Sequence, residues 1–158
     1  MLEPEATTFF REGWRKYLRH LPEDMVHPIE VLVLRGHMLI ERQLIQLIER
    51  NIAKPEALNL ERMTFSSKIR LAEALRGNQT RPWLWEALRG LNKLRNSFAH
   101  KLEDDKRQSH IATFVALIRR DDPLTFSIAG TELDSQLAFS LSWLHERLLN
   151  ESISIGEG

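Results

Sequence analysis

Residues 28–52, PIEVLVLRGHMLIERQLIQLIERNI, decide the fold class of this chain. Apolar side chains recur there at three- and four-residue spacing and cover a wide arc of a helical wheel. Pro28 is tolerated in a first helical turn. Pro55 stops the pattern after Lys54, because a residue that precedes proline resists the α conformation. The stretch therefore predicts one long amphipathic helix with a buried face.

The chain on both sides of this helix also follows helical periodicity. Helices are expected over residues 8–20, from an N-cap at Thr64 to 76, over 80–102, from a cap at Asp105 to 120, and from a cap at Thr131 to about 151. A short extended segment is expected where Leu124, Phe126 and Ile128 alternate with polar residues. We expect an all-α, up-down bundle of four main helices plus short extra helices. Residues 1–27 would be an N-terminal helical extension, 28–152 the bundle and 153–158 a frayed tail.

Length and composition exclude several classes of protein. The 158 residues leave room for one domain, and the absence of cysteine excludes disulfide scaffolds, thiolate nucleophiles and cysteine-based zinc sites. The first residues, MLEPEATT, lack the apolar core of a signal peptide, and no apolar run approaches the ~20 residues of a membrane span. No nucleotide-binding loop or metal-ligand spacing is present. The expectation is a cytoplasmic protein without cofactor, metal site or membrane contact.

The net charge of zero hides an uneven distribution along the chain. Residues 1–34 carry a charge of −2, residues 35–120 carry +8, and residues 121–158 carry −6. Each charge taken alone is explained by a solvated helix face. The basic middle segment as a whole also allows local contact with a polyanion.

Three polar residues fall where the periodicity predicts a core. His37 and Glu41 lie four residues apart near the middle of the apolar arc of residues 28–52, so they can touch. On the helix predicted for residues 80–102, Arg95 interrupts an apolar seam. A buried arginine needs a carboxylate or an anionic ligand, and Glu41 is its best partner within the chain. His37 and Glu41 would be either a self-satisfied structural pair or the support of a site on the facing helix. The seam consists of Leu84, Leu88, Leu91, Phe98 and Leu102.

His100 lies five residues beyond Arg95. On a straight helix that separation places the two side chains roughly 140° apart. A site that uses both would need a helix distortion or a second chain across a two-fold axis. The other histidines, His20, His27, His110 and His145, belong to no such group and are expected at the surface, while Phe139 and Trp143 suggest a second packing surface.

The string LNKLRNSFAH, residues 91–100, resembles the signature of HEPN domains, which is an Arg followed four to six residues later by a His, with a polar residue after the Arg. The LRNSFAH form resembles the mannitol operon repressor family within this group. The resemblance implies a HEPN-like four-helix bundle that is usually dimeric. It also implies a metal-independent endoribonuclease site where Arg95 and His100 from two protomers meet and Asn96 assists.

Two functions follow from this resemblance. The first is a metal-independent endoribonuclease, a toxin or a stress or defence effector, with RNA as substrate, Arg95 on phosphate and His100 in acid–base catalysis. Its partners would be a second copy of the chain and an antitoxin or regulatory protein, with His37 and Glu41 in support. The alternative is a noncatalytic dimeric regulator or interaction scaffold. An exposed His100 beside a basic two-fold cleft favours the first function, and a buried His100 bonded to the backbone favours the second.

Overall fold

The computed structural model describes residues 28–100 and 104–153, and these residues form helices and turns without a strand. The all-α prediction is therefore confirmed. The helix expected over residues 8–20 lies outside the described residues, as do 154–158 of the expected tail. Ile153 is the last residue of a helix. The four longest helices are α3 (Pro28–Arg50), α5 (Pro82–Ala99), α6 (Asp104–Arg119) and α8 (Leu133–Ile153).

Shorter elements connect these four helices. α4 spans Phe65–Arg76 and α7 spans Pro123–Phe126, while the single 3-10 turns are η2 (Pro55–Ala57), η3 (Leu60–Arg62), η4 (Gly77–Gln79) and η5 (Ser127–Ala129). Thr64 caps α4 as predicted, since its side chain accepts a hydrogen bond from the Ser67 backbone N–H. Gly77 ends α4 with φ of 54°, a conformation that favours glycine.

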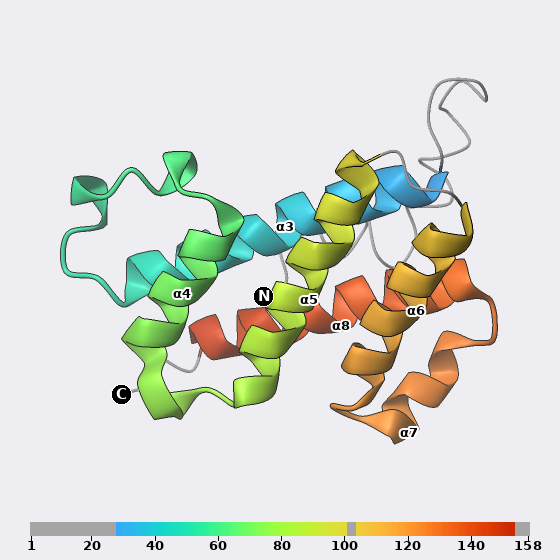
Figure 1. The fold of residues 1–158 in the computed structure, drawn as a ribbon. Coiled ribbons are helices and arrows are strands. Elements are labelled where there is room, and N and C mark those ends of the chain that lie inside the picture. Colours follow the sequence, from blue (N-terminus) through green and yellow to red (C-terminus); the bar gives the residue numbers. More distant parts are fainter. Residues whose placement is uncertain (1–27, 101–103, 154–158) are drawn as a thin grey trace.

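Helices α3 and α8 lie side by side, and α4, α5 and α6 cross them in a second layer (Figure 1). A Cβ atom at Gly36 of α3 would lie 2.8 Å from Cδ1 of the buried Leu141 in α8, so the glycine permits this close approach. The facing sides of the two helices supply much of the core. Their buried aliphatic residues include Leu32, Val33, Ile40, Leu44, Leu47, Leu137, Leu144 and Leu148.

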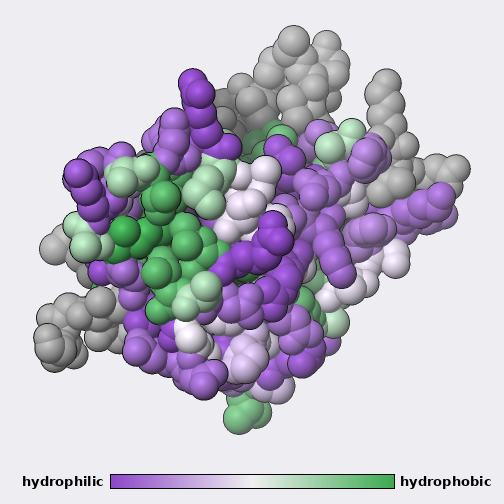
Figure 2. All heavy atoms as spheres, turned by 60° about the vertical axis from the view of Figure 1, so that its left-hand side comes forward, coloured by the Kyte–Doolittle hydropathy of each residue, from purple (hydrophilic) through white to green (hydrophobic). Residues whose placement is uncertain are grey.

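The helices packed against α3 cover only part of its predicted apolar arc. Leu34 is 40% exposed and Met38 is 54% exposed, although both belong to that arc. A second apolar surface lies among hydrophilic residues on the side that Figure 2 brings forward, the side of α4 and the chain that leads to it. Leu58 and Leu75 in this part of the chain are exposed large hydrophobic residues. Within the described ranges, no helix combines the length and the apolar character needed to cross a membrane.

Three details of the secondary structure predicted for residues 104–153 are wrong. The segment with Leu124, Phe126 and Ile128 is not extended, because it forms α7 and η5. The side chain of Asp122 caps α7 by accepting the backbone N–H of Thr125. Asp105 lies inside α6, which already includes Asp104, and α8 begins at Leu133 rather than directly after Thr131.

The buried carboxylate of Asp121 joins three helices. It accepts hydrogen bonds from Arg81 at 2.5 Å, from Arg147 at 2.8 Å and from the Trp143 indole N–H at 2.9 Å. The Trp143 ring stacks on Phe139, with 6.0 Å between the ring centroids. Both aromatic rings are half-buried against the core, so they pack within this chain.

Candidate functional site

A groove between α5 and α6 brings together two of the predicted catalytic residues, Asn96 and His100. Its volume is about 630 Å³. Lys93 and Asn96 lie three residues apart, which places them on one side of α5, and His100 directly follows the end of that helix. The residues that line the groove are Lys93, Leu94, Asn96, Ser97 and His100 on the α5 side and Ser109, His110 and Thr113 on α6.

His100 is exposed at the point where the chain leaves α5. The helix ends at Ala99, short of the predicted Leu102, and His100 follows with an extended backbone at φ −95° and ψ 129°. The prediction that His100 lies within a straight helix is therefore wrong. The backbone turn positions the imidazole beside the groove, and no helix distortion is needed to expose it.

Arg95 is exposed, which corrects the prediction that it interrupts the buried seam of α5. Leu91, Leu94 and Phe98 fill that seam. Leu94 occupies the buried position that the periodicity assigned to Arg95. Successive residues on a helix are turned by about 100°, so burying Leu94 turns Arg95 outward. The Arg95 guanidinium donates a hydrogen bond of 3.2 Å to Oδ1 of Asn96. Arg95 does not line the groove, but its partner Asn96 does.

Glu41 pairs with Lys68 and not with Arg95, so the predicted pairing is wrong. Oε1 of Glu41 lies 2.7 Å from Nζ of Lys68, and Lys68 is only 2% exposed. Lys68 lies on α4 between the buried Phe65 and Ala72, at the spacing of a core position. The charge at that position was the sequence signal for a buried lysine that requires a carboxylate.

His37 is buried beside this ion pair, with its ring centroid 4.3 Å from that of Phe65. Its Nδ1 lies 3.9 Å from Oε2 of Glu41, too far for a hydrogen bond. Burial is the main cause that lowers the pKa of His37 to about 4; Glu41 opposes it, and the positive charges of Arg95 and Lys68 act in the same direction as burial. His37 is therefore neutral at pH 7. His37 and Glu41 are adjacent as predicted, but they form no ion pair at that pH.

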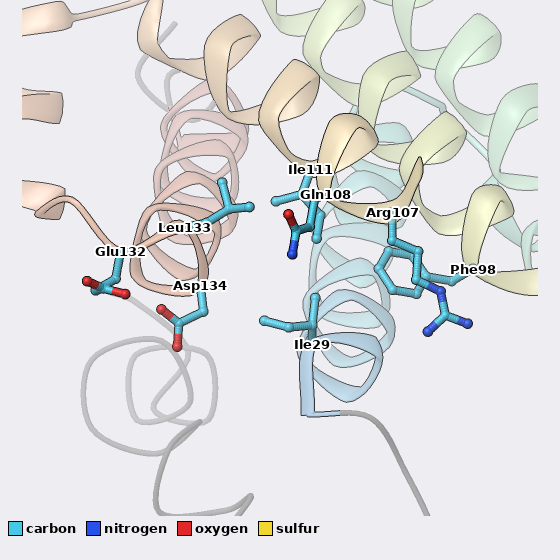
Figure 3. A pocket seen from close by; sticks show the side chains of 8 residues that line it. All are labelled: Ile29, Phe98, Arg107, Gln108, Ile111, Glu132, Leu133 and Asp134. Carbon is cyan, nitrogen blue, oxygen red and sulfur yellow. The ribbon is translucent and has the colours of Figure 1, made fainter. Parts of the chain in front are cut away.

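A second pocket of about 330 Å³ lies where the first turns of α3, α6 and α8 meet the last turn of α5 (Figure 3). Arg107 is at one side, over the ring of Phe98, and the carboxylates of Glu132 and Asp134 are at the other. None of the five predicted site residues lines this pocket. Its remaining lining residues are Ile29, Gln108, Ile111 and Leu133.

Two histidines differ in their surroundings from what the sequence suggested. His145 was expected at the surface, but it is buried, with 3% exposure. His110 is exposed as expected, yet it shares the groove with His100. The sequence contained no local signal for this, because the two residues come from different helices. Among the described residues, no cluster of three or more potential ligands could hold a metal ion.

Comparison with known proteins gives no match to a family model, to a curated protein or to a solved structure. The HEPN resemblance accordingly depends on the sequence of residues 91–100.

Proposed function

We propose that this protein is a HEPN-like, metal-independent endoribonuclease, acting as a toxin or a stress or defence effector in the cytoplasm. The observation that carries the proposal is the exposure of His100 in the groove between α5 and α6, which Asn96 and Lys93 also line. An exposed imidazole in a groove that also holds a cation suits work on a phosphodiester.

The reaction uses the 2′-hydroxyl of RNA as nucleophile. Its oxygen attacks the adjacent phosphorus, the bond from phosphorus to O5′ breaks, and a cyclic phosphate and a 5′-hydroxyl result. His100 transfers a proton in this step, either from the 2′-hydroxyl or to O5′. Arg95 holds non-bridging oxygens of a phosphate through its planar guanidinium, and Asn96 orients Arg95 through their hydrogen bond. DNA lacks the nucleophile and is not a substrate.

A homodimer accounts for the separate directions of Arg95 and His100. In one chain, His100 lines the groove and Arg95 lies outside it. A second copy docked beside the groove would supply its own Arg95 to the RNA that His100 acts on. Light scattering at micromolar concentration should give about twice the mass of one chain, and a strict monomer would remove this composite site.

The alternative function is a noncatalytic dimeric regulator or scaffold that binds an antitoxin or another regulatory protein. The exposed Leu34 and Met38 favour it, because they are four residues apart on α3 and form an apolar strip. In this alternative, Leu34→Glu with Met38→Glu should abolish association. The variant His100→Ala should have no effect.

The decisive experiment is an RNA cleavage assay in EDTA, with labelled single-stranded and hairpin RNAs. Wild-type protein should cleave them, and His100→Ala should be slower by about 10²–10⁴-fold, the usual contribution of a positioned acid or base. The melting temperature should hardly change, since His100 is exposed.

A matched pair of arginine variants tests the phosphate contact. Arg95→Lys should lose most activity, because an ammonium cannot reproduce the bidentate contact of a guanidinium. Arg89→Lys, an exposed position on the same helix that pairs with Glu73, should keep it. Wild-type protein that leaves all of these RNAs intact would contradict the nuclease proposal.

A further inference from the structure

Cleavage of RNA through its 2′-hydroxyl requires two proton transfers at opposite ends of the reacting phosphate. One group takes a proton near O2′ while another gives a proton near O5′, and these oxygens lie on opposite sides of phosphorus. A single imidazole cannot occupy both places in one step. The proposed function therefore leaves a second acid–base group to be identified.

We propose that His110 is this second catalytic residue, acting with His100 of the same chain. This inference rests on the proposed function. His110 is exposed on α6, and it lines the same groove as His100, which follows the last turn of α5. The two imidazoles thus approach the groove from different helices.

The local structure explains why these residues meet. Helices α5 and α6 pack against each other and run in opposite directions (Figure 1). His110 lies six residues after the first residue of α6, about 9 Å along its axis, and His100 is at the adjoining end of α5. Thr113 and Ser109, one turn apart, line the groove beside His110.

The polar groups of the groove divide into those that bond the backbone and those that face a ligand. The Ser97 hydroxyl donates to the Leu94 carbonyl at 2.6 Å, and the Thr113 hydroxyl donates to the Ser109 carbonyl at 2.9 Å. These two hydroxyls stabilise their own helices. The groups that remain for chemistry are the imidazoles of His100 and His110, the Lys93 ammonium, the Ser109 hydroxyl and the Asn96 amide, whose Oδ1 accepts a hydrogen bond from Arg95.

The proton transfers balance within this set. The neutral imidazole of one histidine takes the proton of the 2′-hydroxyl as the bond from O2′ to phosphorus forms. The imidazolium of the other histidine gives its proton to O5′ as the bond from phosphorus to O5′ breaks. The Lys93 ammonium keeps its protons throughout and offsets the negative charge of the non-bridging oxygens.

The test is the pH dependence of cleavage in EDTA by the full chain and two variants of His110. A reaction with one acid and one base gives a bell-shaped profile of kcat against pH. His110→Gln keeps hydrogen-bonding capacity but transfers no proton, so kcat should fall by about 10²–10⁴-fold and one limb of the profile should disappear. His110→Lys keeps a positive charge and should not restore the rate. Ala112→Gln, exposed on the same helix and outside the groove lining, is the control and should match wild type.

The outcomes separate this inference from the proposed function. If the wild type cleaves RNA and His100→Ala does not, the function stands. If His110→Gln then keeps full activity and a bell-shaped profile of kcat against pH, the proposed role of His110 is overturned. Recovery of activity in His110→Lys, or a change in KM alone, would also overturn it, since either would show only phosphate binding. An inert wild type would refute both proposals.

Discussion

Replacing His37 should remove part of the protein's sensitivity to acid. The His37 side chain is buried against Phe65, and in the part of the chain that the structure describes its Nε2 atom has no hydrogen-bonding partner. Burial is the main reason that its pKa falls to about 4, and the charges of Arg95 and Lys68 act in the same direction. Glu41 acts against them but does not compensate for the burial. Folding therefore favours the neutral imidazole.

The sign and the size of the effect follow from linkage. An unfolded histidine has a pKa near 6.5, so between about pH 6.5 and pH 4 the unfolded chain binds a proton at residue 37 that the folded chain does not. The contribution of His37 is fully present above pH 6.5 and is lost as the pH falls through 4. The lowering of the His37 pKa from 6.5 to about 4 corresponds to about 3 kcal/mol of unfolding free energy.

The assay is urea unfolding at pH 7 and at pH 4 for wild type, His37→Leu and His37→Phe. The phenylalanine variant keeps a ring beside Phe65, so the two variants separate packing from titration. At pH 7 each variant differs from wild type by its own packing term. Between pH 7 and pH 4 both should gain about 3 kcal/mol relative to wild type. If all three proteins lose stability in parallel, His37 is not the acid-sensitive group and the reasoning fails.

Two further predictions concern charged groups of the core. Glu41→Ala should lower the free energy of unfolding in urea by about 3 kcal/mol, because it leaves the Lys68 ammonium buried without its partner. Adding Lys68→Met to the same chain should recover much of this loss. Recovery by Arg95→Met instead would contradict the observed pairing of Glu41 with Lys68. Asp121→Ala should cost about 2 kcal/mol because it leaves the Trp143 N–H unpaired. As a control, Glu86→Ala breaks an exposed ion pair with Arg120 and should change the unfolding free energy by less than about 0.5 kcal/mol. Equal effects of Asp121→Ala and Glu86→Ala would show that the buried Asp121 carboxylate has no special role.

Local signals predicted the main helices of the bundle, although not all of their ends. The long apolar repeat after Pro28 predicted α3 to within two residues of its end at Arg50. The Thr64 cap and the Gly77 stop predicted both ends of α4. The alternation around Phe126 gave a wrong prediction of an extended segment, because three apolar residues at even spacing also fit a short helical turn. The segment begins as a helix, capped by the Asp122 side chain. Capping and proline effects act over a few residues, so they can be recognised without the fold.

Side-chain partners depended on the tertiary structure. The spacing on α5 allowed either Leu94 or Arg95 to face the core, and the helices packed against α5 determined that Leu94 is buried. Lys68 became the partner of Glu41 because α4 packs on α3. His110 joined His100 because α5 and α6 pack as neighbours. Helical periodicity specifies which residues share a face, but only the packing of one helix on another specifies what that face meets.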